Sequence, residues 1–183
     1  SEGKSREANI LLEKSIDRIP KKLGRDHIEY FQLNNIITIR LCLSKTYYLL
    51  GHIHKAKKTC NDILKLMPSN QEAKKQLARC YINTKHYTKA LATLSRIKDP
   101  YACTLRGSIY LAQNFYKKAL TEFKKAVPKS CNLPSRHYNL GIASIKFGEY
   151  NNAIQEFKKT LYLDPSNIQA KRMLFRASLK NSF

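Results

Sequence analysis

Small and large apolar residues recur along the chain at a spacing that predicts pairs of antiparallel helices. Around each marker of the pattern the apolar positions recur every three or four residues, as on the buried face of an amphipathic helix. The markers are four alanines that follow one another at intervals of 34, 29 and 34 residues: Ala56, Ala90, Ala119 and Ala153. A period of about 34 residues made of two helices is typical of an α-helical solenoid.

Four copies of the pattern can be delimited, at residues 37–70, 71–99, 100–133 and 134–167. Each copy predicts a first helix (helix A) and a second helix (helix B) joined by a tight turn. Glycines or polar pairs, which can end a helix, stand at the predicted turns: Gly51, Lys85–His86, Gln113–Asn114 and Gly148. The copy at 71–99 is the short one, so we expect its helix B or the following turn to be abbreviated.

The residue types indicate close packing of helix B on helix A. Each helix A has a small residue where helix B must approach: Ser44, Ala78, Gly107 and Gly141. Four residues after each marker alanine stands the residue expected to fill the interface: Cys60, Leu94, Phe123 and Phe157. Pro68 and Pro165 follow a helix B, where proline stops the helix.

This order of small residue, aromatic residue, alanine, aromatic residue and proline resembles the tetratricopeptide repeat family over residues 37–167. The copy at 134–167 matches best, whereas Cys60 and Leu94 stand where the family prefers an aromatic residue. The resemblance implies an all-α, right-handed α-solenoid of tandem helix-turn-helix repeats. It also implies a non-catalytic scaffold or adaptor that works through protein–protein interaction.

The ends of the chain are interpreted as parts of the same array, so that residues 1–183 form a single solenoid domain. Residues 5–20 have the spacing of a helix B and its proline, and we expect a half-repeat there. Residues 21–36 are an insertion or an extension of the first helix A, which would then run from about Asp26 to Leu50. Residues 168–180 are expected to form a capping helix. Because the chain opens within a repeat, we expect it to be part of a longer protein.

The charge of the chain is strongly positive, with 34 lysines and arginines against 13 acidic residues and a net charge of +21. Three interpretations remain open. The lysines can be the solvated face of the B helices, a bias of composition to which doublets such as Lys57–Lys58, Lys117–Lys118, Lys124–Lys125 and Lys158–Lys159 point. They can attract an acidic protein or peptide, or they can meet the phosphates of a nucleic acid.

The cysteines and the hydropathy pattern bear on the compartment. The five cysteines form no Cys-x-x-Cys pair, and we interpret them as small buried apolar residues of a protein in a reducing environment: Cys42, Cys60, Cys80, Cys103 and Cys131. No apolar run reaches the roughly 18–20 residues that span a bilayer. We expect an intracellular protein, cytoplasmic or nuclear.

Catalytic signals are weak. The histidines form no metal-binding cluster, and no phosphate-binding or nucleophile motif is present. His52 and His54 are expected at the surface of a turn, and His137 in the packed interior. We therefore expect no enzymatic activity, no metal and no cofactor.

Family ligands usually lie in the concave groove lined by the A helices, and the repeat frame gives the residues that would face it. These candidate partner-binding residues are Lys45, Tyr48, Lys75, Arg79, Asn83, Tyr101, Tyr138, Asn139, Lys146, Arg172 and Arg176. Their cationic and aromatic character suits an extended acidic peptide. It also suits single-stranded RNA stacked on the tyrosines, which is the alternative function. The tyrosines can equally pack on their neighbours. Self-association of the array is a further possibility.

Chaperone-binding members of the family hold a terminal carboxylate with a fixed set of Lys, Asn and Arg side chains on three successive A helices. In one register the frame supplies Leu41 and Lys45, then Gln76, then Tyr101 and Leu105. In the alternative register it supplies Lys75 and Arg79, then Leu105, then Ser135 and Asn139. Neither set matches, so we do not expect a clamp of that type.

Overall fold

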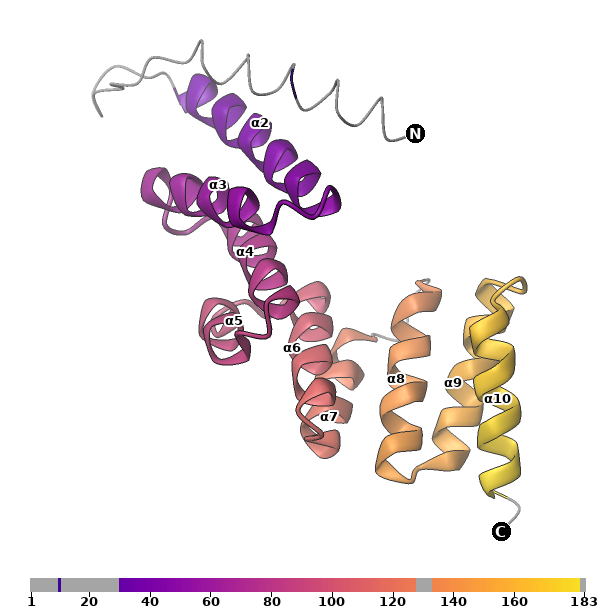
Figure 1. The fold of residues 1–183 in the computed structure, drawn as a ribbon. Coiled ribbons are helices and arrows are strands. Elements are labelled where there is room, and N and C mark those ends of the chain that lie inside the picture. Colours follow the sequence, from indigo (N-terminus) through magenta and orange to yellow (C-terminus); the bar gives the residue numbers. More distant parts are fainter. Residues whose placement is uncertain (1–9, 11–29, 128–132, 182–183) are drawn as a thin grey trace. The chain divides into compact units, whose positions relative to one another are not determined.

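The computed structural model describes residues 10, 30–127 and 133–181, and all regular elements in these ranges are α-helices (Figure 1). The chain divides into two compact units, Ser1–Ser95 (unit 1) and Arg96–Phe183 (unit 2). The half-repeat expected at 5–20 lies outside the described residues, apart from residue 10, as do residues 26–29, Cys131 and Phe183.

The described part of unit 1 contains four helices, each packed against the next along the chain. They are α2 (Tyr30–Leu49), α3 (Ile53–Leu66), α4 (Gln71–Asn83) and α5 (Tyr87–Leu94). The first of them is long because it begins at Tyr30, ahead of the expected repeat start at Ile37. By contrast, α5 has only eight residues, which confirms that the short copy has an abbreviated helix B.

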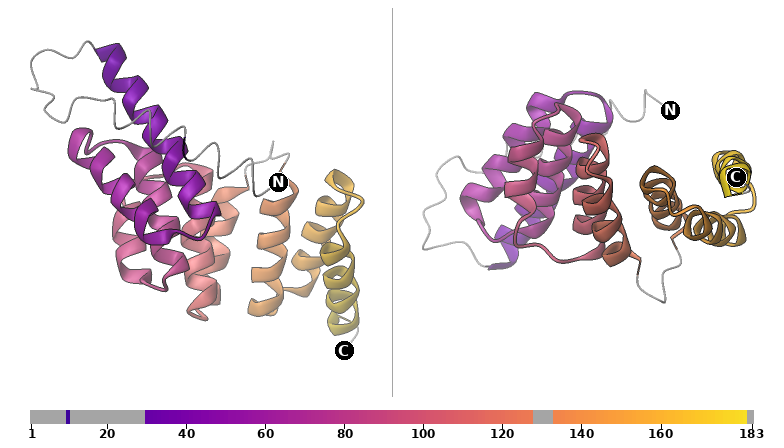
Figure 2. Two further views of the ribbon diagram at one scale, coloured as in Figure 1. Left: turned by 45° about the horizontal axis from the view of Figure 1, so that its top comes forward. Right: turned by 90° about the horizontal axis from the view of Figure 1, so that it is seen from below.

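The described part of unit 2 contains five helices in the same alternating arrangement, and α8, α9 and α10 lie side by side in both views of Figure 2. They are α6 (Pro100–Ala112), α7 (Tyr116–Ala126), α8 (Pro134–Phe147), α9 (Tyr150–Leu163) and α10 (Ile168–Asn181). In each unit, then, the first helix of a pair packs against the second, and the second against the first helix of the following pair.

The four turns between helix A and helix B are closed in the same way. In each turn a backbone N–H bonds the carbonyl five residues earlier, as in a Schellman motif: His52 to Tyr47, His86 to Tyr81, Phe115 to Tyr110 and Glu149 to Ser144. One residue of each turn has a positive φ, at 78° for Gly51, 58° for Lys85, 62° for Asn114 and 92° for Gly148. The turn positions predicted from the sequence are therefore confirmed.

Side-chain caps define where three of the first helices begin. Asn70 accepts a hydrogen bond from the Ala73 N–H at 2.8 Å, and Asp99 does so from Ala102 at the same distance. Asn167 caps α10 through the Ala170 N–H at 2.9 Å. Each of these caps satisfies a backbone donor that the first turn of a helix leaves unpaired, so the polar residue that precedes each helix fixes its start.

Residue size in the interfaces between helices A and B differs between the units. In unit 2, a Cβ atom added at Gly107 or Gly141 would lie 2.7 Å from the ring of Phe123 or Phe157, so each glycine is needed for the aromatic ring to fit. In unit 1 the corresponding pairs are smaller, Ser44 with Cys60 and Ala78 with Leu94, and all four side chains are fully buried. The Ser44 hydroxyl donates a hydrogen bond to the Leu41 carbonyl at 3.0 Å.

Candidate partner-binding site

In unit 1, four of the predicted groove residues come together and are paired with one another or with a neighbour. Lys45 Nζ lies 3.4 Å from Glu72 Oε1, and Lys75 Nζ lies 3.1 Å from Glu72 Oε2. The Arg79 guanidinium covers the ring of Tyr48, with its central carbon 4.3 Å from the ring centroid. This surface is therefore occupied by its own ion pairs and by a cation–π contact.

Glu72 is the centre of that arrangement. Burial raises the pKa of its carboxyl, but the hydrogen bond and charge of Lys75, together with those of Lys45, outweigh burial and lower the pKa below 4.5. Arg79 Nη1 also donates to Gln76 Oε1 at 3.1 Å, while the buried Gln76 Nε2 has no hydrogen-bond partner among the described residues. Asn83 is exposed at the end of α4. A ligand at this face would have to compete with Glu72 for the two lysines.

In unit 2 the predicted residues separate into two groups. Tyr138 belongs to the core, because its ring packs on Phe157 with centroids 5.8 Å apart. The others are at least partly accessible: Tyr101 is 38% exposed at the start of α6, Asn139 is half-buried on α8, and Lys146, Arg172 and Arg176 are exposed. Of the two roles considered for the tyrosines, binding a ligand or packing on a neighbour, Tyr138 therefore has the second.

Two of the exposed cations, Lys146 and Arg176, line a pocket of about 380 Å³ inside unit 2. Its wall is formed by the second half of α8 and the turn after it, the start of α9 and one side of α10, with one residue from α7. The lining residues are Tyr116, Ile142, Ile145, Lys146, Phe147, Gly148, Tyr150, Met173, Arg176 and Lys180. Lys180 Nζ lies 5.8 Å from the centroid of the Tyr150 ring. Cationic, aromatic and aliphatic groups meet here, and this lining holds no acidic residue.

Sequence reasoning did not assign Tyr116, Tyr150 or Lys180 to a site, although the repeat period contains the signal. Tyr116 and Tyr150 are separated by one period of 34 residues, and so are Lys146 and Lys180. The pocket is thus built from positions that correspond in consecutive repeats. Comparing each repeat position along the chain would have selected these residues.

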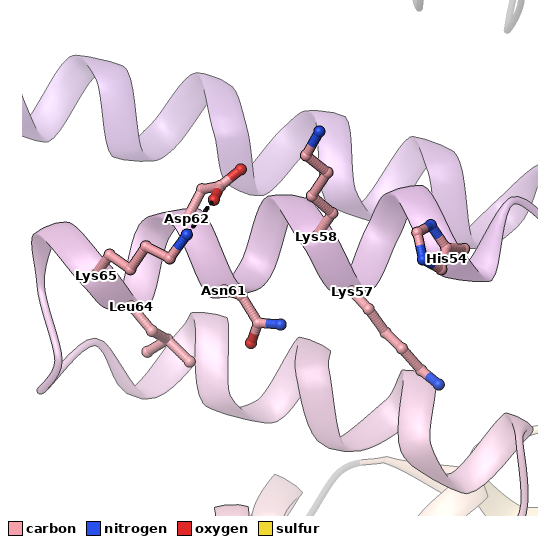
Figure 3. A pocket seen from close by; sticks show the side chains of 7 residues that line it. All are labelled: His54, Lys57, Lys58, Asn61, Asp62, Leu64 and Lys65. Carbon is pink, nitrogen blue, oxygen red and sulfur yellow. Dashed lines mark hydrogen bonds and ion pairs between the residues drawn. The ribbon is translucent and has the colours of Figure 1, made fainter. Parts of the chain in front are cut away.

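A second pocket, of about 670 Å³, lies along α3, which supplies all the described residues that line it (Figure 3). Two of its lysines are engaged: Lys65 pairs with Asp62 at 3.4 Å, and Lys57 donates to Thr84 Oγ1 at 3.0 Å. Figure 3 shows Lys57 and Lys58 extending in opposite directions from the helix. Because one helix provides these groups and they diverge, this pocket is a weaker candidate than the convergent one in unit 2.

Unit 2 also contains two carboxylates that are almost enclosed between helices A and B. Arg106 Nε donates to Glu122 Oε2 at 2.7 Å, and His137 Nδ1 lies 2.7 Å from Glu156 Oε2. Burial raises the pKa of Glu122, but hydrogen bonds and charges of Lys125 and Arg106 outweigh it and lower the pKa below 4.5. The packed position predicted for His137 is confirmed, whereas its carboxylate partner was not foreseen.

The cysteines agree with the prediction at three of the four described positions. Cys60, Cys80 and Cys103 are buried and free, and burial raises the pKa of the Cys60 thiol to about 12, which keeps it protonated and unreactive. For Cys42 the prediction of burial is wrong. It is exposed because it precedes the buried pair Leu43 and Ser44 on α2 and points away from the packed face.

The described residues contain no group of three or more His, Cys, Asp or Glu side chains arranged to hold a metal ion. None of the described helices has the combination of length and apolarity needed to cross a membrane.

Family models and relatives agree with the repeat pattern. Two models described as tetratricopeptide repeat match residues 47–102 and 134–167. The chain is 28% identical over 132 residues to BBSome complex member BBS4 of Bos taurus, a match that covers 70% of this chain and 25% of the relative. It is 28% identical over 126 residues to anaphase-promoting complex subunit 3 of Schizosaccharomyces pombe, covering 64% and 19%. The chain therefore spans a quarter or less of these relatives.

Solved structures show the same fold. The thermophilic tetratricopeptide repeat protein TTC0263 of Thermus thermophilus superposes with a TM-score of 0.72 at 16% identity, covering 97% of this chain and 92% of that protein. The first repeat domain of Spaghetti (RPAP3), bound to the HSP90 peptide SRMEEVD, superposes with a TM-score of 0.58 at 19% identity, covering 62% and 94%.

The helix pairs, the four equivalent turns and these matches define the class: the chain contains tetratricopeptide repeats at residues 47–102 and 134–167, and the expected all-α helical-repeat fold is confirmed. The family is one of protein–protein interaction modules.

Proposed function

We propose that the chain is a non-catalytic scaffold, a subunit of a multiprotein complex, which binds an acidic segment of a protein partner through unit 2. The observation that carries this proposal is the pocket where Lys146, Arg176 and Lys180 converge on aromatic and aliphatic side chains without an acidic residue in the lining. An acidic side chain can form charge-assisted hydrogen bonds there while its apolar neighbours pack against Ile142 and Tyr150.

The absence of internal competition favours unit 2 over unit 1 as the binding surface. Among the described residues, neither Lys146 nor Arg176 has an ion-pair partner, whereas Lys45 and Lys75 share Glu72. A ligand carboxylate that reaches unit 2 is attracted by Lys146 and Arg176 without competition from a protein carboxylate. In unit 1 the ligand carboxylate must displace that of Glu72 from the two lysines. Asn139 and Arg172 would extend the contact beyond the pocket on α8 and α10.

The relatives support this assignment at the level of class. BBS4 and anaphase-promoting complex subunit 3 are both named as members of multiprotein complexes. The repeat domain of Spaghetti binds a peptide with three acidic residues. In this chain Lys146, Arg176 and Lys180 would take the role of anion-binding groups, since the sequence lacks the chaperone-binding set. The three free buried thiols favour an intracellular, reducing location.

The RNA-binding alternative loses two of its three stacking platforms. The ring of Tyr48 is covered by Arg79 and that of Tyr138 packs on Phe157. Base stacking on aromatic rings supplies much of the affinity of single-stranded nucleic-acid binding. We therefore favour a protein partner over RNA.

The test is a fluorescence anisotropy titration with a labelled peptide in which glutamates alternate with leucines, at about 50 and about 200 mM salt. Lys146→Glu/Arg176→Glu should weaken binding about tenfold or more at low salt, because two attractions become repulsions. The matched control is Lys117→Glu/Lys158→Glu, which changes the net charge equally at exposed lysines of α7 and α9.

Equal weakening by both pairs would mean that the peptide responds only to net charge, and the pocket would lose its assignment. Tighter binding of a labelled single-stranded RNA than of the peptide, lost in Lys146→Glu/Arg176→Glu, would replace the protein partner by RNA.

A further inference from the structure

The last described helix, α10, is apolar on two opposite sides. Its inner side is buried, with Ala170 and Ala177 fully enclosed. Ile168, Phe175 and Leu179, at spacings of seven and four, form a stripe on the opposite side and are 62%, 68% and 49% exposed. We call these three residues the α10 stripe. Figure 1 draws α10 as the outermost helix of unit 2, and within the described residues it contacts only α8 and α9.

The repeat frame shows that the α10 stripe is not prepared for a helix B of the usual kind. Phe175 lies one period of 34 residues after Gly141. At this position the preceding A helices carry a serine, an alanine or a glycine, since a small residue lets helix B approach. A phenylalanine here holds any helix that packs on α10 further away. The stripe is therefore shaped for a differently packed occupant.

Charge restricts what that occupant can be. Alongside the stripe α10 carries Lys171, Arg172, Arg176 and Lys180, and it contains no acidic residue. A second copy of this chain would bring the same cations against each other and would add to the repulsion of a net charge of +21. An occupant with acidic residues beside its apolar side chains would instead pair with Lys171 on one border of the stripe and with Arg172 and Arg176 on the other.

We propose that the α10 stripe is a docking surface for an amphipathic helix of a partner protein whose apolar face is bordered by Asp and Glu. From Ile168 to Leu179 the stripe extends about 16 Å, the length of about three helical turns. Phe175 lies at its centre and is the anchor that such a helix would cover. None of the three apolar residues of the stripe lines the pocket of unit 2, although Arg176 and Lys180 border both surfaces, and the substitutions below separate the two.

The test uses a synthetic peptide of about 14 residues, labelled at one end, with leucines at helical spacing on one face and glutamates on both borders. Phe175→Ala/Leu179→Ala should raise the Kd about tenfold or more, because it removes the anchor without touching the buried face. The matched control is Tyr162→Ala, which truncates a residue that is 87% exposed outside the stripe and should leave the Kd unchanged. Lys146→Glu alters the pocket and not the stripe, so it should have no effect either.

Three results would overturn the proposal. One is unchanged affinity in Phe175→Ala/Leu179→Ala. Another is equal affinity for a peptide of the same composition with its leucines scattered around the helix. The third is sedimentation of the unliganded chain as a dimer that this double variant converts to a monomer, which would make a second copy the occupant. If the Lys146→Glu variant alone loses the peptide, the pocket and not the stripe holds it.

Discussion

In unit 1, Lys45 and Lys75 share a carboxylate, whereas in unit 2 Lys146 and Arg176 do not. All four cations lie on the first helix of a helix pair or on the last described helix, α10. Unit 1 pairs Lys45 and Lys75 of its predicted groove with Glu72 and covers the Tyr48 ring with Arg79. Unit 2 encloses two of its carboxylates, Glu122 and Glu156, which join helix B to helix A. The location of the acids, more than the number of lysines, decides which surface can receive an anionic ligand.

The two units also differ in the side chains that fill the interfaces between helix A and helix B. Unit 2 fills its helix A–helix B interfaces with phenylalanine against glycine, and unit 1 uses smaller pairs. Because a large ring contributes more buried apolar area, we expect the packing of unit 2 to be more sensitive to truncation.

Removing a buried ring should have the largest effect. Phe157→Ala should lower the free energy of unfolding by about 3–5 kcal/mol, through lost burial and the cavity left behind. Cys60→Ala, at the corresponding position in unit 1, should cost only about 1 kcal/mol. Chemical denaturation followed by circular dichroism, with hydrogen exchange to locate the effect, measures both. Equal costs would contradict the difference in packing between the units.

Adding a methyl group should be the next largest change. Gly141→Ala should destabilise unit 2 by about 1–3 kcal/mol, since the new Cβ would lie 2.7 Å from the Phe157 ring, although alanine is the better helix former. Gly141→Ala/Phe157→Leu recreates the alanine–leucine combination of Ala78 and Leu94. A double-mutant cycle should therefore show that the two substitutions offset each other; simple additivity would mean that the ring does not need the glycine.

The third prediction concerns acid. The pKa of Glu122 is lowered in the folded state, so its ionised form stabilises unit 2 above about pH 4.5, and this contribution is lost as the pH falls through the folded pKa. Glu122→Gln should cost about 1–2 kcal/mol at neutral pH, because Arg106 loses a charged partner. The gap between variant and parent should shrink below pH 4.5 in urea titrations. If the difference in the free energy of unfolding between variant and parent stays constant down to pH 3, the Arg106–Glu122 ion pair does not cause it.

The smallest effect on stability should come from the exposed counterpart of Glu122. Glu72→Gln should cost less than about 1 kcal/mol, since the Glu72 side chain is 43% exposed and solvent screens its pairs. It should also release Lys45 and Lys75 and increase the affinity of unit 1 for an acidic peptide about two- to fivefold. Anisotropy measured in the Lys146→Glu/Arg176→Glu background isolates this gain. No gain would mean that Glu72 is not what blocks the surface.

Much of the fold follows from the sequence because helix ends and helix interfaces depend on local residue types. The turns at Gly51 and Gly148 and the shortened α5 were all expected from spacing and turn chemistry. The candidate site is less predictable, because it depends on which side chains on neighbouring helices reach one another. The repeat frame places Lys45 and Lys146 among the groove residues, but it does not indicate that Glu72 of α4 reaches Lys45 of α2. It likewise does not distinguish Tyr138, which packs on Phe157, from an accessible tyrosine.

The most direct test of the account is to titrate the glutamate–leucine peptide into isotope-labelled protein and follow every assigned backbone amide by NMR. We predict that the shifts concentrate on α8, α9 and α10 around Lys146 and Arg176, while amides near Lys45 and Lys75 change little. Shifts centred on Lys45, Lys75 and Arg79, or spread evenly over all lysine-bearing helices, would contradict the claim that unit 2 carries the binding surface.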